Sequence, residues 1–244
     1  MCPWRVQGSA TGSRGRLRSS SPFCMIVHSM SDYRPAGGPA LDGDRPALPR
    51  AASAALAASL AALPVTVLMG ARQTGKSTLV QTSPNLSERP YLTLDDLDVR
   101  IDAKERPDDL LSRSSSLTLD EVQRDPELML AVKRAVDGDR PRRPGRFVLT
   151  GSANLLLMRR ISESLAGRAG YVTLWPMVRG ELQGHGRAGA WGELLSSPVD
   201  AWPALLEARD SSPADWRELA RVGGYPTPAY ELDSDAARSV WFRG

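Results

Sequence analysis

The chain has 244 residues and a mass of 26.4 kDa, which is room for one α/β domain or for one domain and part of a second. Its hydrophobic fraction of 41% and charged fraction of 24% are those of a chain that folds around a core. No apolar run approaches the roughly 18 residues that a membrane-spanning helix needs, and the two cysteines form no metal-ligand cluster. We therefore expect a cytoplasmic protein without a membrane span, a disulfide scaffold or a zinc site.

The net charge of +3 is unevenly distributed along the chain. Residues 1–50 hold seven Arg and three Asp, whereas residues 51–244 hold 24 basic and 25 acidic residues. Because the basic surplus lies at the N-terminus, the charge of the folded part does not support a nucleic-acid-binding face.

Residues 1–48 are rich in Gly, Pro, Ser and Arg and have no apolar periodicity. Such a composition predicts a disordered leader. Met30 opens the sequence MSDYRP, which is a plausible start of the protein. A start codon assigned too early and a functional basic arm are therefore both open interpretations of this segment.

Residues 49–184 alternate between helical and strand-like segments. An alanine-rich helix over 51–63 ends at Pro64, and an amphipathic helix is predicted over 126–136. Short apolar runs predict strands at 65–69, 91–94, 117–119, 147–150 and 171–174. This alternation predicts an α/β fold, with a parallel sheet, helices on both faces and functional groups at the carboxyl ends of the strands.

Residues 185–244 lack the alternation of helices and strands and instead contain helical segments in AWGELL, DAWPALLEA and PADWRELARV. Four of the six tryptophans lie here, and their helical setting predicts core packing; they are Trp191, Trp202, Trp216 and Trp241. The sequence stops at WFRG without a helix stop signal. We interpret this part as the start of a second, helical domain that is truncated.

The clearest chemical motif is GARQTGKS at residues 70–77, which has the G-x-x-x-x-G-K-[ST] spacing of a phosphate-binding loop. It follows a predicted buried strand and opens a helix, which is the context that such a loop requires. Lys76 can reach the β- and γ-phosphate oxygens, and the hydroxyl of Ser77 can ligate Mg²⁺. We predict that ATP and Mg²⁺ bind here, through Gly70, Ala71, Arg72, Gln73, Thr74, Gly75, Lys76, Ser77 and Thr78.

A second motif, LTLDE, ends a predicted strand with two carboxylates, Asp120 and Glu121. A phosphate-loop nucleotide site needs an aspartate at a strand end to hold the hydrated Mg²⁺, and a following glutamate can polarise the attacking water. We therefore predict that Ser77 and Asp120 form the metal site and that Glu121 is the general base.

A third motif, FVLTGSAN, ends another strand with polar groups. In ATPases with a multi-stranded central sheet, the strand that ends in the aspartate and glutamate has a neighbouring strand. A polar side chain on that neighbour contacts the γ-phosphate. Ser152 and Thr150 are candidates for this role, and Asn154 is a weaker one. The alternative for Ser152 is a helix N-cap.

Arginines and aspartates near the ends of strands are less specific signals. Arg168 could reach a γ-phosphate across a subunit boundary of a homo-oligomer, as an arginine finger does, and a surface salt bridge is the alternative. Arg159 and Arg160 are weaker candidates for the same role. Asp95 and Asp96 could line the cleft or cap a helix.

The segments GARQTGKSTL, YLTLDD, LDEVQRDPELMLAVKRAVD, FVLTGSAN and ESLAGRAGYVTLWPM together resemble a bacterial and archaeal family of AAA-type ATP-binding proteins. In that family the ATPase domain precedes a helical domain of unknown function numbered 4143. The resemblance covers roughly residues 48–177, and GGYP in 222–226 resembles a turn near the start of the second domain. It implies that 70–77 is the Walker A loop, Asp120 and Glu121 the Walker B pair, and Ser152 the sensor region.

These patterns predict an ATP-binding protein in which Mg²⁺-dependent hydrolysis moves the C-terminal domain. Catalytic roles would fall to Lys76, Glu121, Ser152 and Arg168. The alternative is a regulatory module that binds ATP without useful turnover. A small-molecule kinase is a third interpretation, and it is disfavoured because a carboxylate pair suited to water is less expected there.

Overall fold

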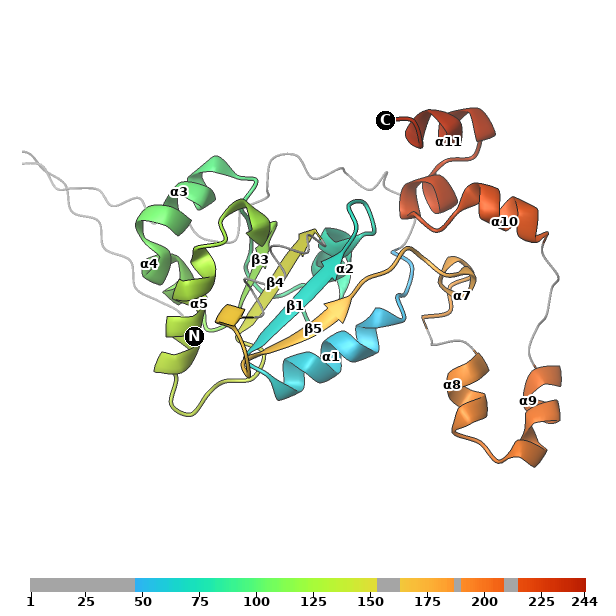
Figure 1. The fold of residues 1–244 in the computed structure, drawn as a ribbon, viewed down its shortest axis with the longest axis horizontal. Helices are drawn as coiled ribbons and strands as arrows, with labels where there is room; N and C mark the ends of the chain where they lie inside the picture. Colours follow the sequence, from blue (N-terminus) through green and yellow to red (C-terminus); the bar gives the residue numbers. More distant parts are fainter. Residues whose placement is uncertain (1–46, 153–162, 187–189, 209–214) are drawn as a thin grey trace, which may run out of the picture. The chain divides into compact units, whose positions relative to one another are not determined.

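The computed structural model describes residues 47–152, 163–186, 190–208 and 215–244 (Figure 1). The predicted disordered leader lies almost wholly outside these ranges. None of the helices in the described ranges combines the length and the apolarity that crossing a membrane demands.

A five-stranded parallel sheet with the strand order β2-β3-β4-β1-β5 forms the centre of the fold. Its strands are β1 (Val65–Gly70), β2 (Tyr91–Thr93), β3 (Leu117–Asp120), β4 (Phe147–Ser152) and β5 (Ala169–Thr173). All five strands agree in position with the sequence predictions, and the α/β P-loop NTPase fold class is confirmed. β5 begins two residues earlier than predicted, because Ala169 and Gly170 pair in register with Val65 and Thr66 although a glycine weakens the strand pattern.

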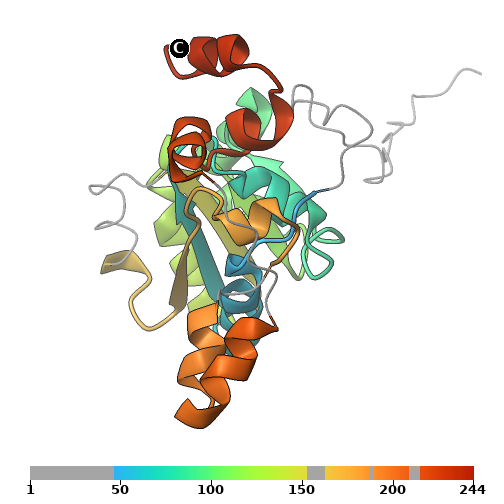
Figure 2. The same ribbon diagram turned by 90° about the vertical axis from the view of Figure 1, so that its right-hand side faces the viewer.

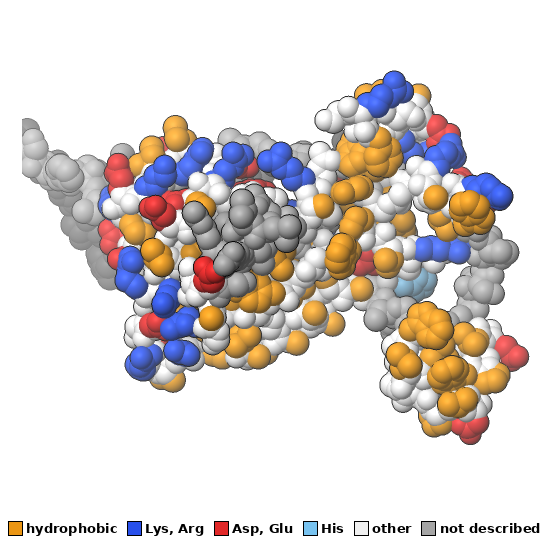
Figure 3. All heavy atoms as spheres, in the orientation of Figure 1, with side chains coloured by type: hydrophobic (Ala, Val, Ile, Leu, Met, Phe, Trp, Pro, Cys, Tyr) orange, Lys and Arg blue, Asp and Glu red, His pale blue; other side chains and the backbone are white. Residues whose placement is uncertain are grey.

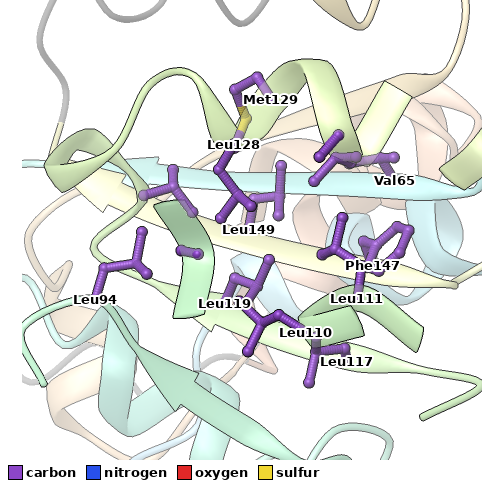
Figure 4. Packing of buried hydrophobic residues seen from close by; sticks show 14 of the residues in the cluster. Val65, Leu94, Leu110, Leu111, Leu117, Leu119, Leu128, Met129, Phe147 and Leu149 are labelled. Carbon is purple, nitrogen blue, oxygen red and sulfur yellow. The ribbon is translucent and has the colours of Figure 1, made fainter. Parts of the chain in front are cut away.

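Helices cover both faces of this sheet, as Figures 1 and 2 show. They are α1 (Ala52–Ala62), α2 (Lys76–Thr82), α3 (Leu97–Glu105), α4 (Pro107–Ser112), the short η2 (Val122–Arg124) and α5 (Leu128–Gly138). One apolar cluster joins α3, α4 and α5 to the strands through side chains such as Leu111, Val132 and Phe147 (Figure 4). A second cluster joins α1 and α2 to the opposite face through Leu56, Leu79 and other buried residues. The alternation of side chains along each strand therefore supplies both cores.

No helix ranges were predicted between β2 and β3, where the structure has α3 and α4, although a helix cap at Asp95 or Asp96 was one of the two roles considered for those residues. α3 is short and mostly polar, so its apolar periodicity is weak. The sequence nevertheless contains a helix start signal, Asp96. In the structure, its side chain accepts hydrogen bonds from the backbone N–H groups of Asp98 and Val99. Of the two roles considered for Asp96, the structure shows the helix cap. Pro107 occupies the first turn of α4, where a proline is well tolerated.

The C-terminal part is helical, as predicted. Its elements are α7 (Arg179–Leu182), α8 (Ala190–Leu195), η3 (Val199–Ala201), α9 (Trp202–Glu207), α10 (Trp216–Val222), η4 (Thr227–Glu231) and α11 (Asp235–Trp241). Core packing was wrong for two tryptophans, since Trp191 is 70% exposed and Trp216 is 66% exposed. Apolar side chains also lie at the surface around α8 and α9 (Figure 3). Helical periodicity identifies an apolar face, but it does not tell whether another element covers that face.

Candidate nucleotide-binding site

The strand order brings the three predicted motifs to one edge of the sheet. β4 pairs with β1 on one side and with β3 on the other, and all three strands are parallel (Figure 1). Their carboxyl ends are therefore neighbours. Loop 70–77 follows β1, Asp120 ends β3, and Thr150 lies near the end of β4.

Loop 70–77 has two backbone positions with positive φ, one at a glycine and one at a residue that is not glycine. Gly75 has φ 88° and Gln73 has φ 62°, so the chain twice enters the left-handed region. A Cβ atom on Gly70 would lie 2.4 Å from the carbonyl oxygen of Leu174 and 2.9 Å from the hydroxyl of Thr74. Close approach of neighbouring groups thus requires glycine at position 70. Ala71, Arg72 and Gln73 are exposed on the outer part of the loop.

Lys76 is buried inside the curve of this loop, with only 5% of its surface exposed. Its Nζ donates hydrogen bonds to the carbonyl oxygens of Gly70, at 3.2 Å, and Ala71, at 2.8 Å. Burial lowers the pKa of Lys76 below its ordinary 10.5, and the charges of Glu121 and Asp120 act in the opposite direction. Because the partners of this cation among the described residues are neutral backbone carbonyls, it can exchange them for the oxygens of negatively charged phosphate groups.

Asp120 is the centre of a set of hydroxyl groups and is only 3% exposed. Its Oδ2 accepts a hydrogen bond from Ser77 Oγ at 2.8 Å and another from the Tyr91 hydroxyl, and its Oδ1 accepts one from Thr150 Oγ1. Burial, and then the Asp120 carboxylate, raises the pKa of Tyr91 far above its ordinary value, so the phenol stays a donor. Tyr91 was missed in the sequence, where it reads only as the first residue of a strand.

The donor set beside the loop suits a magnesium ion. Mg²⁺ is usually held by one or two protein oxygens together with water and substrate phosphates, rather than by a cage of protein ligands. Ser77 and Asp120 supply one hydroxyl and one carboxylate at hydrogen-bonding distance. Within the described ranges, no group of three or more His, Cys, Asp or Glu forms a metal cage. The residues present therefore fit Mg²⁺ better than a metal that needs many protein ligands.

Glu121 follows Asp120 directly and has φ 57°, a left-handed conformation that is uncommon outside glycine. Its carboxylate accepts a hydrogen bond from the side-chain amide of Gln123. The same amide accepts, through its oxygen, a hydrogen bond of 3.3 Å from the backbone N–H of Ser152 at the end of β4. Gln123 was not predicted as a site residue. Of the two candidates on β4, it is Thr150 whose side chain contacts Asp120.

Arg50 is a third residue, after Tyr91 and Gln123, that was not predicted from the sequence. It is buried, and its guanidinium donates to the carbonyl oxygens of Thr74, at 2.8 Å, and Trp175, at 2.6 Å. It also forms an ion pair of 3.3 Å with the buried Glu181. Arg50 therefore connects the phosphate-loop backbone to the segment after β5.

Arg168 lies away from this edge. It precedes β5, and its carbonyl oxygen accepts a hydrogen bond from Val65 N at the opposite end of β1 from loop 70–77. Its guanidinium binds both carboxylate oxygens of Asp137, at 2.7 and 2.8 Å. The structure thus does not bring Arg168 to the other site residues of its own chain. Asn154, Arg159 and Arg160 lie outside the described residues.

The fold and this site define a P-loop NTPase domain. Residues 63–183 match the family model AAA_14, described as AAA domain, which supports an AAA-type P-loop domain in this part of the chain. An AAA-type domain indicates nucleotide binding.

Two curated proteins are similar to the chain over 187 residues at 39% identity: the uncharacterized proteins Mb2031c of Mycobacterium bovis and Rv2008c of Mycobacterium tuberculosis. The match covers 75% of this chain and 39% of each relative. The chain therefore spans well under half the length of the curated relatives that it matches.

Solved structures that the chain matches include the Walker-type ATPase paby2304 of Pyrococcus abyssi, at 17% identity and a TM-score of 0.45, covering 81% of this chain and 73% of that one. The ORC1 protein of Aeropyrum pernix, solved in complex with DNA, has 16% identity and a TM-score of 0.43, covering 83% and 63%. AMPPCP-bound DnaA from Aquifex aeolicus has 16% identity and a TM-score of 0.38, covering 69% and 57%.

Proposed function

We propose that this protein binds ATP with Mg²⁺ in loop 70–77 and hydrolyses it to ADP and phosphate. The observation that carries the proposal is the hydrogen bond of 2.8 Å between Ser77 and Asp120, which joins the loop to the carboxylate strand. A hydroxyl and a carboxylate meet there beside a buried lysine, at the edge of the sheet where ligands of α/β folds bind.

In this proposal, Lys76 leaves the carbonyl oxygens of its own loop and binds the β- and γ-phosphate oxygens. Backbone N–H groups of the loop bind the remaining phosphate oxygens. Ser77 and Asp120 hold Mg²⁺, whose charge offsets that of the phosphates. Thr150 and Tyr91 keep the Asp120 carboxylate oriented toward Ser77.

Glu121 is the proposed general base. The oxygen of a water molecule forms a bond to the γ-phosphorus while the bond from that phosphorus to the bridging oxygen of ADP breaks. The electron pair of the broken bond stays on ADP, and Glu121 accepts the proton of the water. The charge of Glu121 already acts on Lys76, which supports its closeness to the phosphate site.

The proposed output is a movement of the C-terminal helices. Arg50 links the Thr74 carbonyl to Glu181 in α7, and Met177 N donates a hydrogen bond of 2.6 Å to the carbonyl of Gly224. A shift of loop 70–77 on phosphate binding would therefore displace Arg50 and the segment after β5, which contact the C-terminal part. These contacts support the proposal that nucleotide state is transmitted in this direction.

Replacing Glu121 with Gln tests hydrolysis. We expect ATP affinity to be retained, because Ser77, Lys76 and Asp120 are unchanged, and phosphate release to fall by about 10²-fold or more. Glu105→Gln on the exposed end of α3 is the matched control, with normal turnover expected. Wild-type protein that binds ATP and releases no phosphate would favour the regulatory module. A normal rate in Glu121→Gln would show that Glu121 is not the base.

A further inference from the structure

The side chain of Gln123 joins two strands of the site at the level of the proposed base. Gln123 lies in η2, the single turn that follows Glu121. Its Nε2 donates to Glu121 Oε2, and its Oε1 accepts the N–H of Ser152 at 3.3 Å. One neutral amide therefore connects the carboxylate after β3 with the end of β4.

The backbone at Glu121 and at Gly151, the two positions beside the Gln123 amide, leaves room for this amide. Glu121 adopts a left-handed φ of 57°, a conformation that is unfavourable for a residue other than glycine. On the other side, a Cβ atom on Gly151 would lie 2.7 Å from Gln123 Oε1 and 3.5 Å from Val122 Cγ2. A larger residue at 151 would therefore displace the amide. The contact depends on the conformation at one end and on the absence of a side chain at the other.

The chemistry of the amide is specific. The position requires a donor toward a carboxylate and, at the same time, an acceptor for a backbone N–H. Glutamine supplies both on a side chain of this length. Methionine has nearly the same shape and supplies neither, and glutamate keeps the acceptor while adding a charge beside Glu121.

We propose that Gln123 is a positioning residue that directs the Glu121 carboxylate toward the attacking water and couples its orientation to the end of β4. This inference rests on the proposed ATP hydrolysis. Because one carboxylate oxygen is held by Gln123, the direction of the other oxygen is set by the same bond. A movement of the β4 end on γ-phosphate binding or release would pass through the amide to Glu121.

Gln123→Met is the primary test, measured by steady-state phosphate release and by ATP titration. We expect kcat to fall about 10- to 100-fold, the cost of a catalytic group misplaced by about 1 Å, with the Kd for MgATP unchanged. Gln123→Glu should lose at least as much turnover, because it repels Glu121. Gln183→Met, at an exposed position after α7, is the matched control and should behave like wild type.

A double-mutant cycle separates positioning from a structural role. If Gln123 acts through Glu121, then adding Gln123→Met to Glu121→Gln should lower kcat no further. Multiplicative losses would overturn the proposal, as would an unchanged or raised kcat in Gln123→Met. A Kd that rises in step with the loss of kcat would also overturn it, because the residue would then belong to nucleotide binding.

Gly151→Ala provides a second route should Gln123→Met fail to fold, since it displaces Gln123 without removing the amide. The same selective loss of kcat is expected, and normal turnover in Gly151→Ala would contradict the proposal. Failure of the underlying function has a different signature. Wild-type protein without phosphate release would remove hydrolysis and this role together, whereas a hydrolysing wild type with a fully active Gln123→Met removes only the role of Gln123.

Discussion

Asp120 accepts hydrogen bonds from hydroxyl groups on three different elements: Ser77 on α2, Tyr91 on β2 and Thr150 on β4. A buried carboxylate is unfavourable unless such donors compensate the loss of water. These donors also fix which way its oxygens face. In the proposed site, Ser77 would pass from Asp120 to the metal, while Tyr91 and Thr150 would keep the carboxylate in place.

Removing the Tyr91 hydroxyl tests this arrangement. A hydrogen bond made to a metal ligand typically changes the metal affinity about 10- to 100-fold. Tyr91→Phe should therefore lower the affinity for Mg²⁺ in the presence of ATP by about 10-fold. ATP binding in the presence of a chelator should stay unchanged. Calorimetric titration of Mg²⁺ into the protein with ATP measures the effect. Tyr171→Phe on β5 is the control, and an equal Mg²⁺ dependence in wild type and Tyr91→Phe would show that the hydroxyl does not serve the metal site.

At the scale of elements, the placement of β4 between β1 and β3 assembles the site. Each motif lies at the carboxyl end of its own strand, and the parallel order gathers them. The opposite ends of the strands are tied by structural contacts, of which the pair between Arg168 and Asp137 is one. It connects the end of α5 to the start of β5.

The pH dependence of stability tests this structural interpretation of Arg168. The hydrogen bond from Arg168 holds the pKa of Asp137 below its ordinary 3.8, despite some loss of solvation. A lowered folded-state pKa contributes stability that is present above pH 3.8 and is lost as pH falls through the folded value. Asp137→Asn should therefore lower Tm at pH 7, and its difference from wild type should vanish in acid.

Calorimetric melting from pH 7 down to about pH 2 measures that difference, and the exposed ion pair of Asp108 supplies the control, because exposed pairs contribute only about 0–1 kcal/mol. Asp108→Asn should change Tm little at any pH. A wild-type Tm in Asp137→Asn at pH 7, combined with loss of turnover in Arg168→Gln, would instead favour the arginine-finger interpretation.

The sequence predicted those features whose residues are contiguous in the chain. Residues 70–77 carry their own spacing, and each strand has a short apolar run, so the loop and all five strands were predictable. The contact between Ser77 and Asp120 also followed, once parallel strands were expected. Tyr91, Gln123 and Arg50 were not predictable, because their roles depend on which strand is the neighbour and on side-chain direction. Arg168 is the opposite case: its place in the sequence suggested a catalytic role, but the topology places it at the edge of the sheet opposite loop 70–77.

At the scale of the whole molecule, the described chain combines a sheet with two buried faces and a helical C-terminal part whose apolar residues are partly exposed. The proposed site belongs to the sheet, and Arg50 and Met177 join that sheet to later segments of the chain. Every proposed role, from the base Glu121 to the amide of Gln123, presupposes that loop 70–77 binds the phosphates of ATP.

The most direct test of that claim is calorimetric titration of MgATP into wild type, Lys76→Ala and the control Lys104→Ala, whose lysine is exposed on α3. Loss of a charge-assisted contact costs about 1.5–3 kcal/mol, so Lys76→Ala should bind roughly 10- to 100-fold more weakly than wild type. Lys104→Ala should bind as wild type does. Equal affinities of all three proteins for MgATP would contradict the assignment of loop 70–77 as the nucleotide site.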